Sequence, residues 1–449
     1  MFDKILIANR GEVALRVIRA TKEMGIKSVV VYSTADADTE AVRMADEAVC
    51  IGPAQSAKSY LNIPAIIGAA QITGAEAIHP GYGFLAENSD FARACIDNDI
   101  VFIGPDPDVM DALGNKANAK ETAARAHVPT VPGSDGVVES VEDAREFARK
   151  VGYPVLVKAS AGGGGKGMRE VYSDEEMESA FNTARNEALS AFGNGDCYIE
   201  KLILRPRHVE IQVLADKHGN RVHLCERDCS IQRRHQKLIE EAPSPALTEE
   251  LRQEMGATAL RMVEASGYTN AGTVEFLLDV DDSFYFMEMN ARVQVEHGVS
   301  ESITGVDIIK EQIRIAAGEE MTCKDRAPFS PFGHAIEFRI NAEDPDNDFR
   351  PSPGKITKLR MPAGPGVRVD THLYEGYTIP PYYDSMLAKL VVWGIDRDEA
   401  IDRARRALDE FVIEGIPTTI PFHKMVVENE DFQRGEVYTD FIEKEFGDN

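Results

Sequence analysis

The stretch Val155-Leu156-Val157-Lys158-Ala159-Ser160-Ala161-Gly162-Gly163-Gly164-Gly165-Lys166-Gly167-Met168-Arg169 joins a short apolar run to a loop with five glycines in six positions. Such a loop cannot pack into a core, but its bare backbone N–H groups can close over phosphates. Lys158, Lys166 and Arg169 add positive charge. The Gly-Lys-Ser/Thr ending of a Walker A loop is missing. Because an apolar, β-branched run directly precedes the glycines, the pattern favours a phosphate-covering lid over a flexible linker.

Strand-like and helix-like segments alternate near the N-terminus. Four apolar runs are expected to be strands: Lys4–Ala8, Ser28–Ser33, Ala48–Gly52 and Val101–Gly104. Glu12–Met24 has helical periodicity, and the alternation predicts βαβ units with a parallel sheet. The first turn, Ala8-Asn9-Arg10-Gly11, has one glycine, whereas a dinucleotide-binding turn needs three spaced glycines. The region is therefore interpreted as a plain α/β layer.

The rest of the chain mixes helices, hairpins and a β-rich end. Further helices are expected at Asp108–Ala126, Val141–Val151, Asp174–Phe192 and Asp396–Val412. Hairpins are expected to pair His208–Ala215 with Val222–Glu226 and Gly272–Asp279 with Phe284–Asn290. From about Ser330 the chain is β-rich. A length of 449 residues suits about three domains of this kind.

Composition and charge narrow the class of protein. The formal net charge is −26, which repels nucleic acid. No apolar run is long enough to span a bilayer, and the N-terminus lacks the features of a signal peptide. The six cysteines form no Cys-x-x-Cys pair and no complete zinc site. We expect free, buried thiols in a reducing cytoplasm.

Polar and apolar residues alternate from Glu288 to Glu296. In an extended chain, Glu288, Asn290, Arg292, Gln294 and Glu296 would share one face. A solvated strand face gives the same pattern, but the preceding run Phe284-Tyr285-Phe286-Met287 is apolar on both faces, as in a covered strand.

Glu275 lies in the middle of a second apolar run, where an unpaired carboxylate would be costly to bury. Glu275, Glu288 and Asn290 offer the oxygen ligands that suit Mg²⁺. Arg292 can bind an anion, and Glu296 can act as a base.

A basic cluster runs from Glu226 to Lys237. It can be a nucleic-acid patch, an ion-paired surface or a small-anion site that faces the carboxylates. The missing aromatic residues count against nucleic acid, and the neighbouring glycine loop and carboxylates favour the small-anion site.

Six motifs in this order resemble those of the biotin carboxylase family, the ATP-grasp subunits of acetyl-CoA carboxylase and related enzymes. They are Gly162–Met168, Arg207–Gln212, Glu226–Ser230, Glu288–Asn290, Val293–His297 and Arg339–Pro345. The resemblance runs nearly end to end. It implies an α/β fold with an N-terminal domain (1–114), an ATP-grasp domain (115–330) whose mobile lid covers about 133–203, and a C-terminal β-rich domain (331–449).

The resemblance also implies roles for individual residues. Nucleotide contacts would be Lys116, Lys158, Gly163, Gly164, Gly165, Glu200, Lys201, Ile203, His208, Gln232, His235 and Leu277. Mg²⁺ or Mn²⁺ would be held by Glu275, Glu288 and Asn290. Bicarbonate would be held by Lys237, Arg292, Gln294 and the Val295 backbone, with Glu296 as the base. Arg339 would stabilise the biotin enolate, and Tyr82 would lie beside biotin.

The implied reaction uses ATP, bicarbonate and biotin on a separate carrier protein to give carboxybiotin, ADP and phosphate. The family would also imply a homodimer and a carboxyltransferase in other chains, since no Met-Lys-Met biotin site is present. The carboxyl acceptor stays open between acetyl-CoA, propionyl-CoA and pyruvate. One departure is Gly298, where the family usually has proline, and it is expected to loosen the bicarbonate loop. The alternatives are another ATP-grasp ligase, which joins a carboxylate to an amine, and a silent nucleotide-binding subunit.

Overall fold

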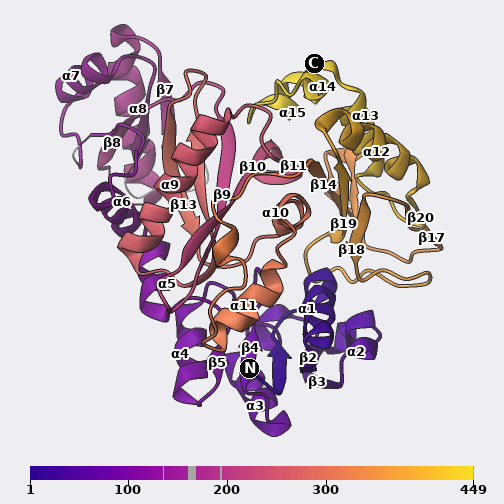
Figure 1. Ribbon diagram of the computed structural model, residues 1–449. Coiled ribbons are helices and arrows are strands. Elements are labelled where there is room, and N and C mark those ends of the chain that lie inside the picture. Colours follow the sequence, from indigo (N-terminus) through magenta and orange to yellow (C-terminus); the bar gives the residue numbers. More distant parts are fainter. Residues whose placement is uncertain (135, 160–167, 193–194, 448–449) are drawn as a thin grey trace. The chain divides into compact units, whose positions relative to one another are not determined.

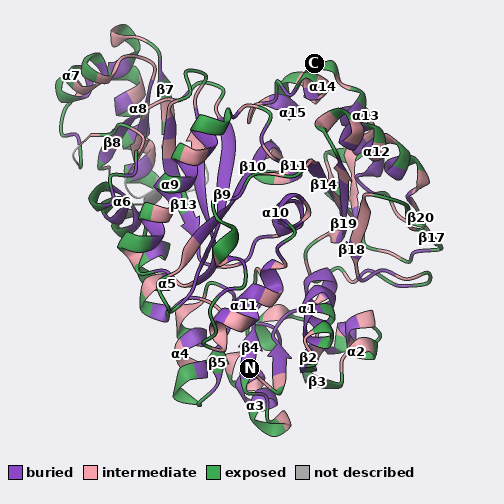
Figure 2. Cartoon of the chain, in the orientation of Figure 1, coloured by how far each residue is buried: buried purple, intermediate pink, exposed green. Residues whose placement is uncertain are grey.

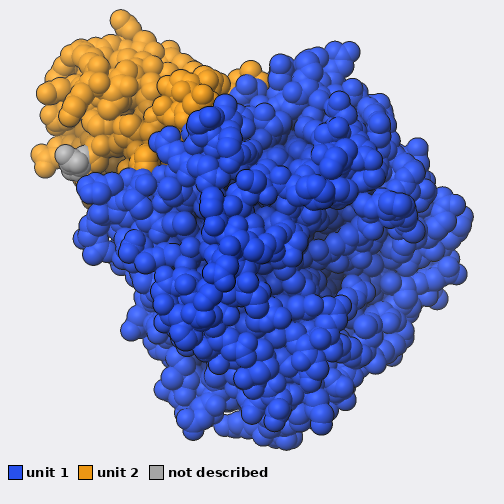
Figure 3. Space-filling view, in the orientation of Figure 1, with its two compact units in different colours: residues 1–128, 207–276, 287–449 blue, residues 129–206, 277–286 orange. Residues whose placement is uncertain are grey.

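The computed structural model describes residues 1–134, 136–159, 168–192 and 195–447. The chain forms two compact units (Figure 3). The first comprises 1–128, 207–276 and 287–449, and the second comprises 129–206 and 277–286. Among the described residues, no helix combines the length and apolar character needed to cross a membrane.

The N-terminal part of the first unit is built on a parallel sheet with the strand order β3-β2-β1-β4-β5 (Figure 1). Its strands are β1 (Lys4–Ile7), β2 (Lys27–Ser33), β3 (Glu47–Gly52), β4 (Ala77–His79) and β5 (Val101–Phe102). The helices are α1 (Gly11–Glu23), α2 (Glu40–Met44), α3 (Ile63–Thr73), α4 (Ser89–Asp97), α5 (Pro107–Gly114) and α6 (Lys116–Arg125). The predicted parallel α/β layer is confirmed.

A larger sheet carries most of the candidate site residues, in the strand order β13-β12-β9-β10-β11-β14-β19-β18. Its strands are β9 (Arg207–Ala215), β10 (Arg221–Arg233), β11 (Gln236–Ala242), β12 (Asn270–Leu278), β13 (Phe284–Asn290), β14 (His334–Asn341), β18 (Val367–Thr371) and β19 (Met386–Gly394). The pairs from β9 to β19 that surround the site are antiparallel. Strand β9 is buried along its whole length (Figure 2), so its polar side chains must find partners inside the protein.

Helices and small strands complete the first unit. The helices are α9 (Glu249–Ser266), α10 (His297–Thr304), α11 (Ile308–Ala316), α12 (Arg397–Glu410), α13 (Ile420–Glu428), α14 (Glu430–Arg434) and α15 (Phe441–Phe446). The small strands are β15 (Glu343–Asp344), β16 (Arg350–Pro351), β17 (Lys358–Arg360) and β20 (Val412–Glu414). Helices α12, α13 and α15 bury apolar residues against β14 and β19 in one core.

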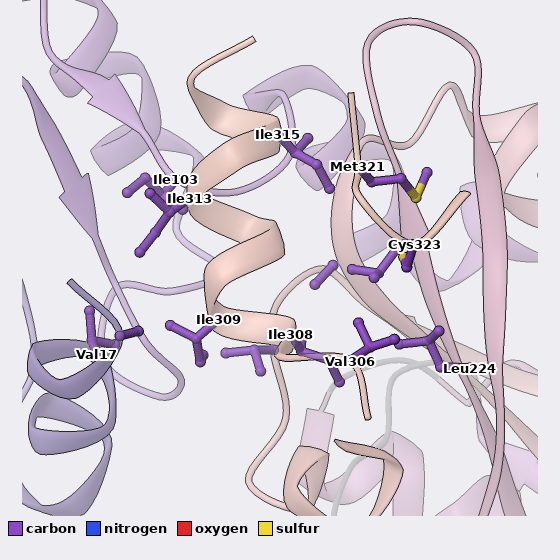
Figure 4. Close-up of a cluster of buried hydrophobic side chains, with 14 of the residues drawn as sticks. Val17, Ile103, Leu224, Val306, Ile308, Ile309, Ile313, Ile315, Met321 and Cys323 are labelled. Carbon is purple, nitrogen blue, oxygen red and sulfur yellow. The ribbon is translucent and has the colours of Figure 1, made fainter. Parts of the chain in front are cut away.

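A second core joins the N-terminal layer to the large sheet (Figure 4). Its link is α11, from which Ile309 points toward Val17 of α1. Just before α11, Val306 lies beside Leu224 of β10. Burial of such side chains contributes roughly 1.5–3 kcal/mol each. The parallel sheet and the large sheet are therefore held together by one continuous apolar core.

The second unit holds the strands and helices that flank the glycine loop. Its sheet has the order β7-β6-β8, from β6 (Val155–Ala159), β7 (Met168–Val171) and β8 (Cys197–Lys201). Helices α7 (Val141–Val151) and α8 (Asp174–Phe192) pack against it through a separate small core. Both helices have the bounds that the sequence predicts. The predicted lid, about 133–203, falls in the segment 129–206 of this unit.

Three expectations need correction. The predicted helix Asp108–Ala126 is two helices, α5 and α6, because Asn115 is extended (φ −86°, ψ 113°) and its side chain accepts a hydrogen bond from Asn118 N. The first strand of the hairpin at His208 begins at Arg207, and its second strand runs on to Arg233 instead of ending at Glu226. All six cysteines are free, but Cys50 is exposed and not buried, because it lies on the edge strand β3.

Glu241 of β11 gives a prediction about acid stability. Burial alone would raise its pKa, but Arg397 (2.7 Å) and His334 (2.7 Å) lower it to about 2. A carboxylate with a lowered folded-state pKa stabilises the protein above its unfolded pKa, and this stability is lost as the pH falls through the folded pKa. We expect wild type to lose about 3 kcal/mol more than Glu241→Gln between pH 5 and pH 2. Urea unfolding at several pH values measures this difference, and parallel pH profiles for the two proteins would contradict it.

Candidate active site

The alternating segment forms a loop and not a strand. Strand β13 ends at Asn290, and Glu296 stands directly before α10 with φ −79° and ψ 10°. The expectation that all five polar residues share one extended face is therefore wrong beyond Asn290. The chain turns because Glu87, distant in sequence, accepts hydrogen bonds from Ala291 N (3.0 Å) and from Arg292 Nε (2.9 Å). The turn still places the polar side chains of the loop beside the large sheet.

Lys237 of β11 lies at the centre of the site. Its ammonium group is 2.6 Å from Glu210, 3.1 Å from Glu275 and 2.7 Å from Glu296. Burial favours the neutral amine, but Glu210 and Glu296 outweigh it and hold the Lys237 pKa well above its ordinary value. Lys237 is therefore a cation at neutral pH. The part of the basic cluster near Lys237 thus faces the carboxylates, whereas Arg233 and Arg234 pair with the exposed Asp348.

Glu275 is paired from several sides, as its position in an apolar strand requires. One oxygen accepts from Gln294 Nε2 (2.7 Å) and Asn290 Nδ2 (2.9 Å), and the other lies 2.9 Å from His208 Nε2. Burial would raise its pKa, but Lys237 and His208 hold that pKa far below the ordinary value. The carboxylate is therefore ionised.

Glu296 bridges two cations. Its oxygens accept from Lys237 Nζ (2.7 Å) and from Arg339 Nη2 (2.9 Å). Burial would raise the Glu296 pKa, but Lys237 and Arg339 hold it well below its ordinary value. Arg339 also donates through Nε to Glu240 (2.6 Å), and burial outweighs this contact and raises the Glu240 pKa to about 7. Glu296 is thus an anion held between two positive side chains.

A buried arginine that the sequence analysis did not assign supports this site from β10. Arg227 is fully buried and is ion-paired with Glu210. Its Nη1 donates to Gln212 (2.7 Å) and Ser300 (2.9 Å), and its Nη2 donates to Gln294 (2.8 Å). The period-two spacing of His208, Glu210 and Gln212 in a run that is otherwise apolar is the sequence signal for a buried polar face.

Two of the three predicted metal ligands are in contact. Asn290 donates to Glu275, while the Asn290 oxygen accepts from Arg292 (3.0 Å). Glu288 lies two residues before Asn290 on the same strand and is exposed. In addition, ligand atoms of His208, Glu210 and Glu275 lie within 4.8 Å of one another. Carboxylate and amide oxygens are the ligands that Mg²⁺ prefers, so the donor set fits this ion.

The remaining predicted residues of the first unit lie at its sheet and N-terminal layer. Gln232 is paired with Lys237 across β10 and β11, and His235 is exposed in the turn between them with φ +64°. Tyr82 donates a hydrogen bond to the buried Glu12. Lys116 is the first residue of α6.

In the second unit, Lys158 of β6 is ion-paired with Glu200 of β8, which is its neighbouring strand. Lys201 donates to the backbone carbonyls of Gly152 (2.9 Å) and Tyr153 (3.1 Å). Ile203 is buried, and Leu277 is half-buried. Gly163, Gly164 and Gly165 lie outside the described residues.

Comparison with known proteins places this geometry in a family. Three family models match: Biotin carboxylase, N-terminal domain (residues 1–110), Carbamoyl-phosphate synthase L chain, ATP binding domain (115–324), and Biotin carboxylase C-terminal domain (337–444). A biotin carboxylase of Nostoc sp. is 58% identical over 99% of this chain and 99% of its own. The chain belongs to the biotin carboxylase family.

Other biotin carboxylase relatives serve different carboxylases. A pyruvate carboxylase subunit of Methanothermobacter thermautotrophicus is 56% identical, over 99% of this chain and 90% of its own. The biotin carboxylase domain dimer of Hydrogenobacter thermophilus 2-oxoglutarate carboxylase, solved with MgADP, ADP and bicarbonate, is 51% identical with a TM-score of 0.88. That comparison covers 99% of this chain and 98% of the other. The resemblance and the three-part α/β fold predicted from it are confirmed.

Gly298, expected to loosen the bicarbonate loop, lies in a helix that follows this loop, and the expected effect on the loop stays a prediction. Gly298 is the second residue of α10, is buried, and has helical and not left-handed backbone angles. A side-chain Cβ there would lie 3.2 Å from Glu337 Oε2 and 3.3 Å from Val391 Cγ2. A glycine at this position therefore avoids crowding against β14 and β19.

Proposed function

We propose that this protein carboxylates biotin with bicarbonate and ATP, giving carboxybiotin, ADP and phosphate. A bicarbonate oxygen attacks the γ-phosphorus of ATP, ADP leaves, and carboxyphosphate forms. Carboxyphosphate then releases phosphate, the phosphate takes the proton from the N1 nitrogen of biotin, and N1 forms a bond to the carboxyl carbon. The observation that carries the proposal is the arrangement of Glu296 between Lys237 and Arg339. A carboxylate-to-amine ligase of the same fold does not require a carboxylate held between two cations in this way.

Lys237 and Arg339 are proposed to draw in bicarbonate, together with Arg292, Gln294 and the Val295 backbone. Bicarbonate bound there would be a second anion, beside Glu296, that is stabilised by the same positive side chains. The second negative charge raises the Glu296 pKa toward the range of a general base. Glu296 can then take the bicarbonate proton while the two cations hold the anion in line for phosphoryl transfer.

The nucleotide is proposed to contact Lys116, Lys158 and His208, with Glu200, Lys201, Ile203, Gln232, His235 and Leu277 around it and the glycines 163–165 over the phosphates. The Lys158–Glu200 pair supports this, because it fixes a cation at the start of the glycine loop. Carboxyphosphate hydrolyses readily, so a lid that excludes water serves the reaction.

Mg²⁺, or Mn²⁺, is proposed to be held by Glu275, Glu288 and Asn290. When bound, the ion neutralises negative charge on the phosphate oxygens. The contact between Asn290 and Glu275 supports this assignment. The 2-oxoglutarate carboxylase relative was solved with MgADP, which supports the same choice of ion.

Biotin is proposed to arrive on a separate carrier protein, with Arg339 stabilising its enolate and Tyr82 beside it. A carboxyltransferase in another chain would complete the reaction. A homodimer in the cytoplasm is part of this proposal, and the dimer of the 2-oxoglutarate carboxylase relative supports it. The proposed domains are 1–114, 115–330 and 331–449. Each of the three family matches lies within one of them, which supports these bounds.

Phosphate release tests the proposed function. With MgATP, bicarbonate and free biotin, we expect release that requires bicarbonate and rises with biotin, because bicarbonate is the attacking group and biotin the acceptor. Each component is omitted in turn while phosphate is measured. A rate of phosphate release that does not change with biotin would instead indicate a carboxylate-to-amine ligase. Tight ATP binding without any phosphate release would indicate a silent nucleotide-binding protein.

A further inference from the structure

A fully buried lysine touches the bicarbonate loop from outside the site described above. Lys389 lies in the middle of β19 and has no exposed surface. Its ammonium group donates to the backbone carbonyl of Val295 at 2.7 Å. It also lies 3.4 Å from Glu12 and 3.9 Å from Asp370. Burying a lysine is costly unless its partners compensate, so this contact calls for a reason.

The sheet places Lys389 directly opposite Arg339. The two residues are register partners on β19 and β14 and therefore project from the same face. Like charges in such a pair are destabilising. Here the pair contacts two consecutive residues of the loop, because Lys389 binds the Val295 carbonyl and Arg339 binds the Glu296 carboxylate at 2.9 Å.

Carboxylates around the two cations offset their repulsion. Glu12 and Asp370 lie beside Lys389, and Glu240 lies beside Arg339. Glu12 also accepts the hydrogen bond of the Tyr82 hydroxyl. One connected set of contacts thus joins the loop to the tyrosine proposed to lie beside biotin.

The bond from Lys389 fixes the peptide plane between Val295 and Glu296. In a trans peptide the N–H of Glu296 points away from the Val295 carbonyl. Holding that carbonyl toward Lys389 therefore aims the N–H, and sets the direction from which the Glu296 side chain leaves the backbone. Without the bond, rotation of this peptide would move the proposed base relative to Lys237.

We propose that Lys389 is a positioning residue. It holds the Val295–Glu296 peptide so that the backbone and Glu296 present a preformed binding site for bicarbonate. This inference rests on the proposed function. It assigns Lys389 no contact with substrate and no proton transfer.

The test compares Lys389→Met with Lys389→Arg in the full chain. Methionine keeps most of the side-chain volume but removes the donor, whereas arginine keeps N–H donors and charge. We expect Lys389→Met to raise the KM for bicarbonate about 10- to 100-fold. This is the range seen in metal sites when a group that orients a metal ligand is lost. The KM for MgATP should change less than about twofold. Lys389→Arg should recover part of the bicarbonate affinity.

Arg252→Met is the matched control, because it also breaks a buried ion pair, with Glu226 at 2.8 Å, but at a place that does not contact the loop. It should lower stability without raising the bicarbonate KM. If Lys389→Met fails to fold, Lys389→Met/Glu12→Gln removes the unpaired carboxylate and carries the same expectation. A bicarbonate KM unchanged in a folded variant, or raised equally with that for MgATP, would overturn the role of Lys389. Wild-type turnover that does not depend on bicarbonate would instead overturn the proposed function.

Discussion

Glu296→Gln is expected to slow biotin carboxylation by at least about 100-fold while ATP binding remains. The carboxylate lies between Lys237 (2.7 Å) and Arg339 (2.9 Å), where it can take the bicarbonate proton in the proposed reaction. Loss of a positioned general base lowers a rate by about 10²- to 10⁴-fold. Glutamine has nearly the same shape but accepts no proton. Phosphate release with biotin and bicarbonate measures the rate, and a direct ATP titration measures binding.

Glu240→Gln is the matched control for this variant. Glu240 binds the same arginine and is fully buried, but its raised pKa of about 7 makes a neutral side chain a close substitute. We expect its rate to fall less than about tenfold. Equal losses in the two variants would show that general disturbance around Arg339, and not a missing base, stops the reaction.

The sequence predicts the regular elements well where local signals agree. The helix Asp174–Phe192 has the expected bounds, since three acidic residues occupy its first turn and suit the helix dipole. The apolar pattern continues across Asn115 and so does not reveal the break there, although Gly114-Asn115 is a recognisable stop and cap.

The site is harder to predict because its contacts join distant parts of the chain. A period-two pattern after Glu288 is the same in a strand and in this loop, and the turn depends on Glu87, about two hundred residues earlier. Lys389 contacts the loop and Glu12 pairs with Lys389, and no local motif contains either pairing. The motif residues could be named from a resemblance, whereas the groups that hold them in place required the fold.

The contact between Arg227 and Glu210 depends on a single β-bulge in β10. At the start of the β9–β10 hairpin, Arg221 pairs with Ala215, and this register continued would place Arg227 opposite Val209. A bulge before Glu226, where Cys225 has φ +62°, shifts the register by one residue. Arg227 then lies opposite Glu210. Such a shift reverses the faces of the strand, and no turn signal announces it.

Arg227→Met is expected to destabilise the protein by about 3–5 kcal/mol, the cost of breaking a buried ion pair from one side. The guanidinium is fully buried, and its loss leaves Glu210 with Lys237 as its remaining ion-pair partner among the described residues. The side-chain oxygens of Gln212, Gln294 and Ser300 lose a donor as well. Urea unfolding at neutral pH measures the change.

The double variant Arg227→Met/Glu210→Gln separates the charge from the packing. If the cost comes from a buried carboxylate that has lost one of its two cationic partners, removing that charge should restore part of the lost stability, and the two substitutions will not be additive. Additive losses would mean that Arg227 acts mainly by filling space. Because Arg227 also holds Gln294, which in turn donates to Glu275 at 2.7 Å, the same variant should lose activity even at temperatures where it stays folded.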